Sequence, residues 1–471
     1  MKKFLYLLPL LTLVFISVSL FLPKLGQTPL KSWDEAWYAE ISRNILKRGS
    51  WFLLWWNGLP YYDHPPTGFW LMALSFKVFG ISEFAARLPS ALAGVGSVVL
   101  VYLLGKEWFD QTVGFIAGII LATTPWFWLR SRQGNLDIIL TFFILLSICL
   151  ATKLRENQKI FPLISAVFAL SFLTKTIIAT GTIPVLIYLI FKNMDRSNRT
   201  NFLLSIFVFL AIILPWYLIN WRQYGLQFLD RNIFVTGLKL PGYKAILSGS
   251  RNFLPVFSFE NTFYNLHMGI LLWYKPFLVS LSVSLFFLKN KPFKVLYLWL
   301  LPYLLIFSLS SKTELWHLII IYPTVALLIA AFLRNISKII PLAPLLILIL
   351  ILIFIVWTGG RMVKGLYKDV VKSQPLNDEI ILSRLAGQNE GIIYIDDDYW
   401  PTAVFYSQKK VIHLVHAGLT LPEIFEKSKK PSLLLTKQWI LERDNIDSKN
   451  YELLEKIGER VLVKSPAGLR N

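Results

Sequence analysis

Three short polar segments of this chain hold residues that are suited to acid–base chemistry. One contains Asp34, within KSWDEAWYAE, and another contains Asp63 and His64, directly before two prolines. The third has Asp137 at the start of a long apolar run. Carboxylate and imidazole groups can exchange protons with a substrate, and they are costly beside an apolar run unless they are paired or used. These segments are the first candidates for a functional site.

The first segment also has a structural explanation. Residues 31–51 are predicted to form an amphipathic helix with one apolar stripe, lying on a membrane surface. In such a helix Ser32 and Glu35 would form a capping box, and Asp34 would complement the positive end of the helix dipole. Asp34 therefore stays a candidate beside that structural alternative.

The other two segments leave similar alternatives open. The two prolines either hold Asp63 and His64 in a fixed turn at the mouth of the next helix, or only separate two helices. Arg130 and Arg132 flank the outer end of one apolar run, and Asp137 begins the next. A salt bridge from Asp137 to one of the two arginines is the structural alternative there, and it is compatible with a functional role.

The elements that carry these residues must be largely membrane-spanning. Of the 471 residues 55% are hydrophobic and only 16% are charged, which excludes an ordinary soluble enzyme. The net charge is +20. In a soluble protein this excess would suggest nucleic acid, but here it indicates cytoplasmic loops and anionic membrane lipids, with no nucleic acid partner. The single Cys149 supports neither a disulfide nor a Cys metal site.

Eleven membrane spans are predicted, with the N-terminus in the cytoplasm. The apolar runs lie at 4–22, 87–105, 112–128, 135–152, 160–173, 176–191, 201–220, 267–288, 293–310, 315–333 and 339–357. Segment 67–80 is treated as an interfacial helix, because the short basic loops then all face the cytoplasm. Two long loops, 23–86 and 221–266, are then external.

The chain divides by composition into a membrane body, 1–360, and a soluble tail, 361–471. The tail holds 17 basic and 15 acidic residues, whereas the body holds 31 and 13. Strands are predicted at 391–395, 402–406, 410–415, 432–436 and 460–464, and helices at 376–387, 421–428 and 451–457. The tail is therefore predicted to be a small extracytoplasmic α/β domain. Its acidic run at 396–398 is interpreted as a solvated turn, and His413 and His416 carry no strong metal signal.

The order of motifs resembles that of the GT-C membrane glycosyltransferases. The motifs are DEAWYAEISRNIL, a D-H-P-P-x-G turn, ARLPSALAGVGSVVLVYLLGKEWF, R-x-R-x-x-x-L-D-x-x-L-T-F-F and FLTKTIIATGTIPVLIYL. The branch that they resemble holds protein O-mannosyltransferases and the aminoarabinose transferase of lipid A. The resemblance covers about residues 30–330 and is absent from the tail. It implies a polytopic α-helical protein of the GT-C type, with about 11 to 13 transmembrane helices.

This resemblance also implies a set of site residues. Asp34 takes the place of the family's catalytic carboxylate, and Asp137 that of its second acidic residue. The remaining residues would bind the donor phosphate or the substrate, and they are Asp63, His64, Arg130, Arg132, Lys175, Lys239 or Lys244, Arg251 and His317. The positions in the later external loop depart most from the family pattern.

The function so implied is inverting transfer of a sugar from a polyprenyl phosphate to a lipid, glycan or protein acceptor, at the outer face of the cell membrane. Asp34 would accept the acceptor's proton, and the cationic side chains would neutralise the leaving phosphate. No cofactor is predicted with certainty. A divalent metal is left open, with Asp63 and His64 as weak candidates.

Two other classes of function remain open from the sequence. One is a transporter or flippase of polyprenyl-linked glycans, although the acidic residues lie at loop ends and no internal repeat is visible. The other is a ligase of lipid-linked oligosaccharides. The sequence separates the ligase poorly from a monosaccharide transferase, since both need a lipid phosphate site and a carboxylate.

Overall fold

A computed structural model describes residues 2–194, 199–237, 258–309, 313–339, 344–368, 378–427 and 431–465. Two compact units are formed. The first comprises Met1–Leu25, Tyr62–Leu71 and Arg87–Val370, and the second comprises Gly26–Tyr61, Met72–Ala86 and Val371–Asn471. The outer loop after the first apolar run is thus grouped largely with the tail, whereas the sequence-based division placed one boundary near residue 360.

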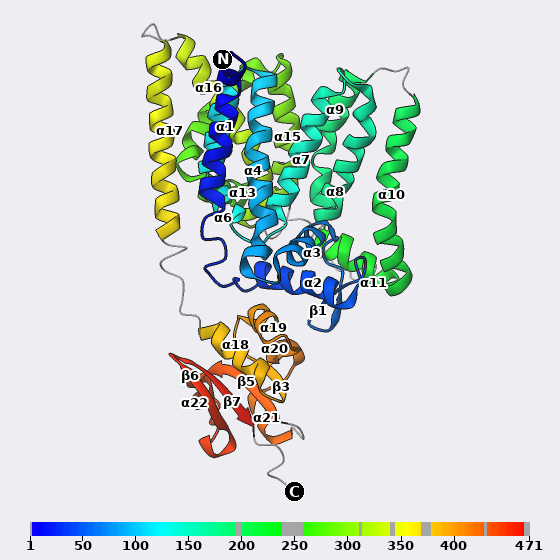
Figure 1. The fold of residues 1–471 in the computed structure, drawn as a ribbon, viewed down its shortest axis with the longest axis vertical. Coiled ribbons are helices and arrows are strands. Elements are labelled where there is room, and N and C mark those ends of the chain that lie inside the picture. The colour runs from blue at the N-terminus through cyan, green and yellow to red at the C-terminus, as the bar shows by residue number, and fades with distance from the viewer. Residues whose placement is uncertain are drawn as a thin grey trace. The chain divides into compact units, whose positions relative to one another are not determined.

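The first unit is a bundle of helices that run side by side (Figure 1). Its longer helices are α1 (Lys2–Phe21), α4 (Glu83–Trp108), α5 (Gln111–Thr123), α7 (Asp137–Lys153), α8 (Phe161–Thr180), α9 (Ile183–Asn193), α10 (Arg199–Tyr224), α13 (Phe259–Ile270), α14 (Tyr274–Ser284), α15 (Lys291–Ser308), α16 (Tyr322–Ile339) and α17 (Pro344–Tyr367). Shorter elements are α6 (Pro125–Ser131), α11 (Leu226–Leu229), η1 (Gln158–Ile160), η2 (Asp230–Gly237), η3 (Leu271–Trp273), η4 (Leu285–Phe287) and η5 (Leu315–Ile321). Two helices are divided between the units. Helix α3 (Thr67–Phe79) belongs to the first unit up to Leu71 and to the second unit from Met72. Helix α4 belongs to the second unit up to Ala86 and to the first unit from Arg87.

Among the described residues, seven helices are long and apolar enough to cross a membrane. An eighth is added if α5 and α6, which are bent by 68° at their junction, count as one span. Shorter apolar helices include Leu7–Phe21, Thr67–Phe79 and Ile183–Asn193. The chain is therefore a multi-pass membrane protein, and the predicted number of eleven spans stays a prediction.

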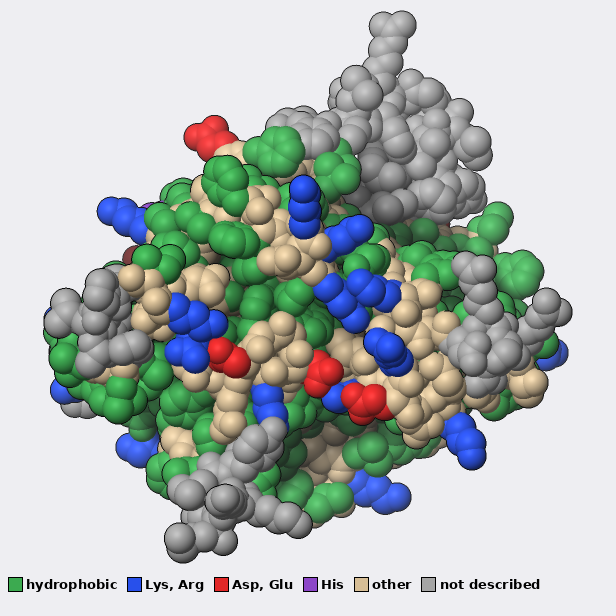
Figure 2. All heavy atoms as spheres, turned by 90° about the horizontal axis from the view of Figure 1, so that it is seen from above, with side chains coloured by type: hydrophobic (Ala, Val, Ile, Leu, Met, Phe, Trp, Pro, Cys, Tyr) green, Lys and Arg blue, Asp and Glu red, His purple; other side chains and the backbone are tan. Residues whose placement is uncertain are grey.

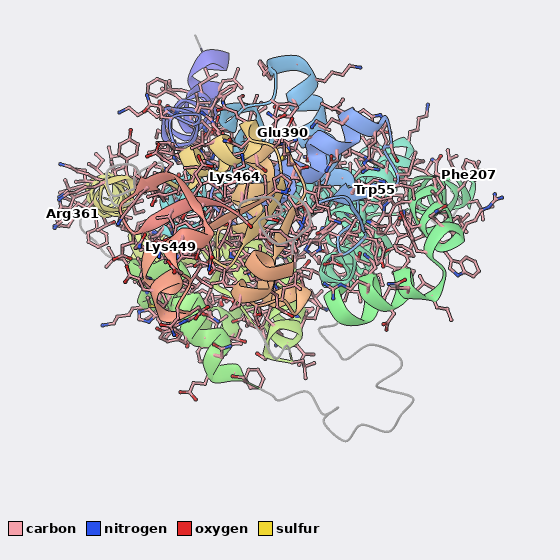
Figure 3. The ribbon with its side chains drawn as sticks, turned by 90° about the horizontal axis from the view of Figure 1, so that it is seen from below. Trp55, Phe207, Arg361, Glu390, Lys449 and Lys464 are labelled. Atoms are coloured by element: carbon pink, nitrogen blue, oxygen red, sulfur yellow. The ribbon has the colours of Figure 1, made fainter. Side chains whose placement is uncertain are left out.

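Burial differs strongly between the centre and the edges of this bundle. The apolar window within Leu315–Ile339, which joins η5 and α16, is 78% buried, whereas that within Thr200–Tyr224 of α10 is only 17% buried. Helices α10 and α17, which carry the labelled Phe207 and Arg361, lie at opposite edges of the bundle (Figure 3). Apolar side chains such as Phe207 point outward from these edges, as expected for helices whose outer faces contact lipid.

Lysine and arginine gather at the end of the bundle where α1 begins, and few acidic side chains are seen there (Figure 2).

Two ion pairs join helix ends. Lys153 at the end of α7 contacts Glu107 of α4 at 2.7 Å, and Arg334 of α16 contacts Asp110 before α5 at 2.9 Å. Asp110 also caps α5 by accepting a hydrogen bond from the Val113 N–H.

The second unit contains a five-stranded sheet in the order β4-β3-β5-β7-β6. Strands β4 (Val411–His413), β3 (Ile392–Ile395) and β5 (Ser432–Lys437) are parallel, and β7 (Arg460–Ser465) is antiparallel to β5 and to β6 (Glu452–Ile457). Its helices are α2 (Asp34–Arg48), α18 (Asp378–Gln388), α19 (Trp400–Ser407), α20 (Leu414–Ala417), α21 (Leu421–Lys427), α22 (Gln438–Arg443) and η7 (Ser448–Asn450). The tail is thus the small α/β domain that its sequence predicts.

Two predicted tail elements and one predicted cap are wrong. Residues 402–406 lie in helix α19, which begins just before Pro401, a residue suited to the first turn of a helix. Residues 452–457 form the exposed edge strand β6. Helix α2 has Trp33 as its N-cap residue, with a φ of 68° and no side-chain capping bond. Glu35 accepts a hydrogen bond from the Lys31 N–H instead.

A two-residue hairpin joins the outer loop to this sheet within the second unit. Strands β1 (Leu54–Trp56) and β2 (Leu59–Tyr61) are connected by Asn57 and Gly58, both with positive φ, which is the Asn-Gly turn typical of hairpins. The Asn57 amide donates to the Val411 carbonyl at 2.7 Å and accepts from the Val411 N–H at 2.9 Å. This side chain therefore pairs with the edge strand β4.

Candidate active site

A buried ion cluster lies where α6, α7 and α8 meet in the first unit. The Lys175 Nζ donates to Asp137 Oδ1 at 2.6 Å, and the Arg130 Nη2 donates to Asp137 Oδ2 at 2.9 Å. The exposed fractions of these side chains are 3% for Asp137 and 7% for each cation. Two cationic side chains thus bind one buried carboxylate.

Asn135 fixes the loop that presents Asp137. Its Oδ1 accepts hydrogen bonds from the N–H groups of Asp137 and Ile138, which satisfies two free donors at the start of α7. Its Nδ2 donates to the Arg130 carbonyl, and its backbone is bonded to the Ser90 hydroxyl of α4. The carboxylate and one of its cations are therefore held by the same side chain.

Lys175 lies at a break in α8. Its backbone has φ −148° and ψ 73°, which are not helical values. A break of this kind interrupts the i→i−4 hydrogen-bond ladder and redirects the side chain. The lysine and the Asp137 carboxylate are both buried, and each compensates for the other's loss of water.

Aromatic rings of η5 and its neighbours line the other side of Arg130. The guanidinium carbon lies 5.4 Å from the centre of the Trp316 ring. His317 follows Trp316, and its Nδ1 accepts a hydrogen bond from the Glu314 N–H at 3.2 Å. The His317 ring is stacked with Phe307 at 6.0 Å between centres. His317 is thus held in a defined orientation next to the residue that contacts Arg130.

Arg132 has a different environment from Arg130. Its guanidinium donates to the carbonyls of Leu20, Phe21 and Pro23 at distances of 2.8–3.3 Å. These carbonyls end α1, and cations are favourable at the C-terminal end of a helix. The salt bridge expected between Asp137 and one of the two arginines therefore forms with Arg130, and Arg132 holds the end of α1.

A second ion pair involves Asp63. Arg231 in η2 binds it in a bidentate manner, with Nε to Oδ1 at 2.7 Å and Nη2 to Oδ2 at 3.0 Å. The neighbouring Asn232 donates to the carbonyls of Tyr62 and Asp63. The second long loop therefore holds the turn that precedes α3.

This pair is connected to the region of Lys175. The Tyr217 hydroxyl of α10 lies 3.3 Å from Asn232 Oδ1 and 3.4 Å from Thr176 Oγ1. Thr176 is the residue after Lys175 in the broken segment of α8. Arg231 and Asn232 were missed from the sequence because their partners are far away along the chain. Lys239, Lys244 and Arg251, which the sequence proposes for this loop, lie outside the described residues.

The two remaining predicted site residues among the described ranges are Asp34 and His64. Asp34 is the first residue of α2 in the second unit and is half-buried. His64, in the first unit, is also half-buried and directly follows Asp63. The structure thus brings Asp137, Arg130 and Lys175 together, and separately pairs Asp63 with Arg231.

The donor set does not favour a metal at these carboxylates. Both oxygens of Asp137 and both oxygens of Asp63 accept hydrogen bonds from cationic side chains. Within the ranges that the structure describes, no group of three or more His, Cys, Asp or Glu residues is placed to hold a metal ion. The arrangement instead presents cationic donors, which are suited to an anion.

The family model for dolichyl-phosphate-mannose-protein mannosyltransferases matches residues 63–219, which carry the ion cluster. The putative mannosyltransferase YkcB of Bacillus subtilis is 37% identical over 162 residues, covering 33% of this chain and 23% of that protein. An undecaprenyl phosphate-aminoarabinose arabinosyl transferase of Pseudomonas savastanoi is 30% identical over 200 residues, covering 40% of this chain and 37% of that protein.

The fold extends this likeness to the whole chain. The crystal structure of ArnT from Cupriavidus metallidurans bound to undecaprenyl phosphate has a TM-score of 0.74 at 16% identity, and it covers 98% of this chain and 99% of that one. The chain is thus similar to these membrane glycosyltransferases in sequence over residues 63–219, and it shares the fold of ArnT over nearly its whole length. Its sequence likeness to the relatives named above covers only about a quarter to a third of their length. The donor and the acceptor of this protein are therefore matters of proposal.

Proposed function

We propose that this protein transfers a sugar from a polyprenyl phosphate to a lipid, glycan or protein acceptor at the outer face of the cell membrane. The observation that carries the proposal is the buried cluster in which two cationic donors, Arg130 and Lys175, lie beside one carboxylate, Asp137. Cationic donors of this kind are suited to binding an anion. A phosphate at the membrane boundary is such an anion, and relatives named for undecaprenyl phosphate and dolichyl phosphate donors support this choice.

In the proposed reaction the acceptor oxygen attacks the anomeric carbon of the sugar. The bond between that carbon and the phosphate oxygen breaks, and its electron pair stays on the phosphate, which gains one negative charge. Direct displacement inverts the configuration of the anomeric carbon. Lys175 and Arg130 would stabilise the charge that develops on the leaving phosphate, because charge-assisted hydrogen bonds are strongest to the more highly charged oxygen.

The two carboxylates have different proposed roles. Asp34 would accept the proton of an acceptor hydroxyl, which requires hydrogen-bond reach in the complex with substrate. Asp137 accepts hydrogen bonds from two cations and would keep Lys175 and Arg130 in place, so it acts as a positioning residue. An acceptor phosphate would be ionised already, and Asp34 would then orient the substrate.

Other residues would shape the site around this cluster. His64 and His317 are proposed to contact the substrate, and the pair of Asp63 and Arg231 would hold the entrance turn. We place Arg132 among the residues that support the site, through the end of α1. No step of the proposed reaction uses a metal.

The proposed topology has the N-terminus in the cytoplasm, eleven spans and the tail outside. The gathering of Lys and Arg at the end of the bundle where α1 begins supports it (Figure 2), because positive residues are enriched in cytoplasmic loops. The helix ends that carry Lys153 and Arg334 belong to that side. Asp137, at the other end of α7, would then face outward.

Asp34→Asn is the experiment that tests catalysis. Cells that lack the gene are supplied with the wild-type protein, Asp34→Asn, or the control Glu452→Gln on an exposed edge strand. Mass spectrometry of envelope lipids, glycans and proteins should show a sugar addition with the wild type and the control. The addition should be absent with Asp34→Asn at equal amounts of protein in the membrane. Undiminished addition with Asp34→Asn would contradict the assignment, and transport of labelled lipid-linked sugar without covalent product would favour a flippase.

A further inference from the structure

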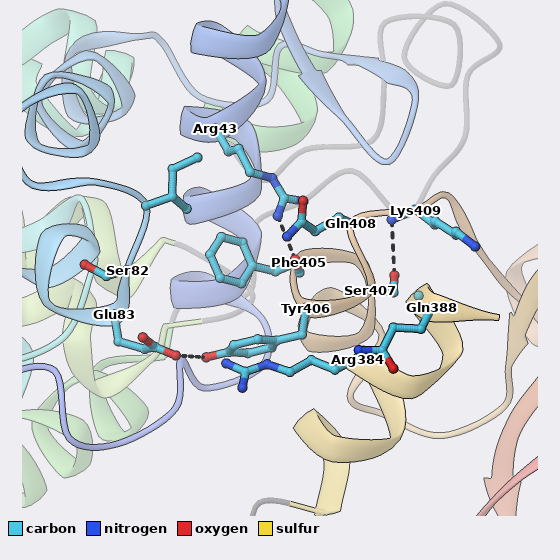
Figure 4. Close-up of a pocket in the computed structure, with 12 residues that line it drawn as sticks. Arg43, Ser82, Glu83, Arg384, Gln388, Phe405, Tyr406, Ser407, Gln408 and Lys409 are labelled. Carbon is cyan, nitrogen blue, oxygen red and sulfur yellow. Dashed lines mark hydrogen bonds between the residues drawn. The ribbon is translucent and has the colours of Figure 1, made fainter. Parts of the chain in front are cut away.

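The second unit contains a pocket of ≈ 550 Å³ that the proposed transfer reaction does not use (Figure 4). Small-molecule sites are typically 300–1,000 Å³ in volume. Its walls come from α2, from the turn before α4, and from α18 and α19 of the tail. The polar and charged residues that line it are Arg43, Ser82, Glu83, Arg384, Gln388, Ser407, Gln408 and Lys409.

The walls of this pocket are fixed by hydrogen bonds between the outer loop and the tail. The Tyr406 hydroxyl donates to Glu83 Oε1 at 2.9 Å and accepts from the Leu30 N–H at 2.9 Å. Arg43 donates to the Phe405 carbonyl at 2.7 Å and is paired with Glu40. A pocket with such walls is largely formed before a ligand binds, which reduces the entropic cost of binding.

The lining carries more positive than negative charge. Arg384 and Lys409 line it together with one carboxylate, Glu83, whereas the charge of Arg43 is balanced by Glu40. The guanidinium carbon of Arg384 lies 5.4 Å from the centre of the Tyr406 ring, which orients its planar donors. Arg43 is only 2% exposed, and its buried Nε has no hydrogen-bond partner. A buried N–H without a partner is costly, so a small shift of this wall that lets a ligand group reach Nε would be favourable.

The remaining polar groups are suited to hydroxyl groups. Gln388 and Gln408 bring amides that can both donate and accept hydrogen bonds, and Ser82 brings a hydroxyl. In Figure 4 the Gln408 side chain lies beside the Arg43 guanidinium. The backbone of Gln408 has a φ of 58° and ends α19, so the helix end directs this residue. Amides and hydroxyls next to cationic donors match a sugar that carries an acidic group.

The pocket is separate from the position of Asp34. Arg43 follows Asp34 by nine residues on α2, so the two lie about 13.5 Å apart along the helix axis. Nine steps of about 100° place them on opposite faces of the helix. A ligand in this pocket therefore does not place its reacting hydroxyl at Asp34 from within one sugar ring.

We propose that this pocket binds an anionic saccharide, that is, a sugar bearing a phosphate or carboxylate group, as a part of the acceptor remote from the reacting hydroxyl. The assignment as part of the acceptor rests on the proposed glycosyl transfer, whereas the binding itself does not. The acidic group contacts Arg43 and Arg384, and the sugar hydroxyls contact the two glutamine amides and Glu83.

Calorimetric titration of the purified full-length protein in detergent tests the binding. The probes are glucose 6-phosphate, glucuronate, glucose and inorganic phosphate. At least one of the two acidic sugars should bind about tenfold or more tightly than glucose and than inorganic phosphate, since a hydrogen bond to a charged group commonly contributes a factor of this size. The better acidic sugar identifies the acidic group. Glucose or inorganic phosphate that binds as tightly as the better acidic sugar would overturn the proposal. So would the absence of binding of both acidic sugars.

Variants locate the site and separate it from catalysis. Arg384→Gln and Gln408→Ala both change exposed positions. Arg384→Gln should weaken the binding of the acidic sugar by about tenfold or more, and Gln408→Ala, which removes a bond to a neutral hydroxyl, should weaken it by about threefold or more. The control Arg443→Gln, at an exposed ion pair of the tail outside the pocket, should leave the affinity unchanged. Asp34→Asn should also leave it unchanged, so failed transfer and failed binding are seen independently. Unchanged affinity in both pocket variants would overturn the location.

Discussion

Asp137 shows how one buried carboxylate can organise an anion site. It is bonded to Lys175 and Arg130, and all three side chains are nearly inaccessible. A buried ion pair in itself contributes little to stability, because the loss of hydration offsets the attraction between the charges. The two buried cations therefore have a better explanation in ligand binding than in folding.

Asp396, in the tail, is predicted to make stability depend on pH. Burial raises the pKa of this carboxyl to about 6, and the negative charge of Asp397 adds to the effect. The folded protein then holds a proton that the unfolded chain releases above about pH 4. The protonated carboxyl therefore adds to the free energy of unfolding at low pH. This contribution, at most about 3 kcal/mol, is lost as the pH rises from about 4 through 6.

Asp396→Asn should remove that dependence, because an amide does not titrate and can still accept the hydrogen bond from Thr436 Oγ1. Hydrogen exchange of the amides of strands β3 and β5, measured between pH 4.5 and 7 and corrected for the intrinsic rate, is the suitable measurement. Protection in the wild type should fall across this range relative to the variant. Parallel profiles for the two proteins would show that the carboxyl does not titrate as expected.

At this scale the sequence predicted the site only where partners are near in the chain. The salt bridge of Asp137 with one of two nearby arginines was expected, and the structure selects Arg130. The capping role of Asn135 was predictable from its type and position, since asparagine is preferred where its side chain can accept hydrogen bonds from the first N–H groups of a helix. Arg231 had none, because 168 residues separate it from Asp63. The acidic run at 396–398 is also less solvated than predicted, because Arg460 and Lys437 bind the buried Asp397.

At the scale of elements, the contact between α4 and α5 depends on glycine. A Cβ atom on Gly114 would lie 2.4 Å from the Tyr102 carbonyl oxygen, and a Cβ on Gly105 would lie 2.6 Å from the Gly114 Cα. Small residues allow membrane helices to approach closely. Gly114→Ala should therefore force the two helices apart and destabilise the bundle by about 1–3 kcal/mol, the usual cost of overpacking.

A matched control separates this steric effect from the loss of glycine itself. Gly360 in α17 has open space around the position of a Cβ. Gly360→Ala should leave stability unchanged or raise it slightly, by up to about 1 kcal/mol. Thermal unfolding in one detergent compares the three proteins. A Gly114→Ala protein as stable as the wild type would refute the close packing.

The Asn57 hairpin offers a second test of an element contact. Asn57→Gly keeps a residue that tolerates positive φ but removes both hydrogen bonds to Val411. The edge strand should lose about 1–3 kcal/mol of local stability, since buried backbone groups lose their partners. Faster hydrogen exchange at Val411, with unchanged exchange in β7, is the expected result. Unchanged exchange at Val411 would show that the amide does not hold the strand.

Elements were predictable where the periodicity was strong. The strands at 392–395 and 432–437 are buried and apolar, and the sequence placed both. Edge strand β6 has an exposed, charged sequence, so its apolar residues gave a misleading helical spacing. The short segment 402–406 is apolar throughout, and periodicity alone does not separate a buried helix from a strand in such a run.

At the scale of the whole molecule, composition established a membrane protein with a separately folded tail. It could not show that residues 26–61 of the outer loop group with that tail. Their contacts, such as those of Asn57 with Val411, join residues 354 positions apart. Composition changes along the chain reveal linkers, but they do not reveal pairing between distant segments.

The excess of positive charge has two explanations at this scale. Many basic residues lie at helix ends on one side of the bundle, as expected for cytoplasmic loops (Figure 2). A smaller number lie buried or line a pocket, such as Arg130, Lys175 and Arg384. The account therefore rests on whether the buried cluster in the first unit binds a lipid phosphate.

Binding of undecaprenyl phosphate to the purified protein in detergent tests that claim most directly. We expect Lys175→Met to weaken binding by about tenfold or more, because the cluster loses a buried positive charge and a charge-assisted donor. Lys175→Arg, which keeps the charge, should bind better than Lys175→Met, and the control Lys159→Met, at an exposed position, should bind as the wild type. Equal affinity of a folded Lys175→Met protein and the wild type would contradict the account.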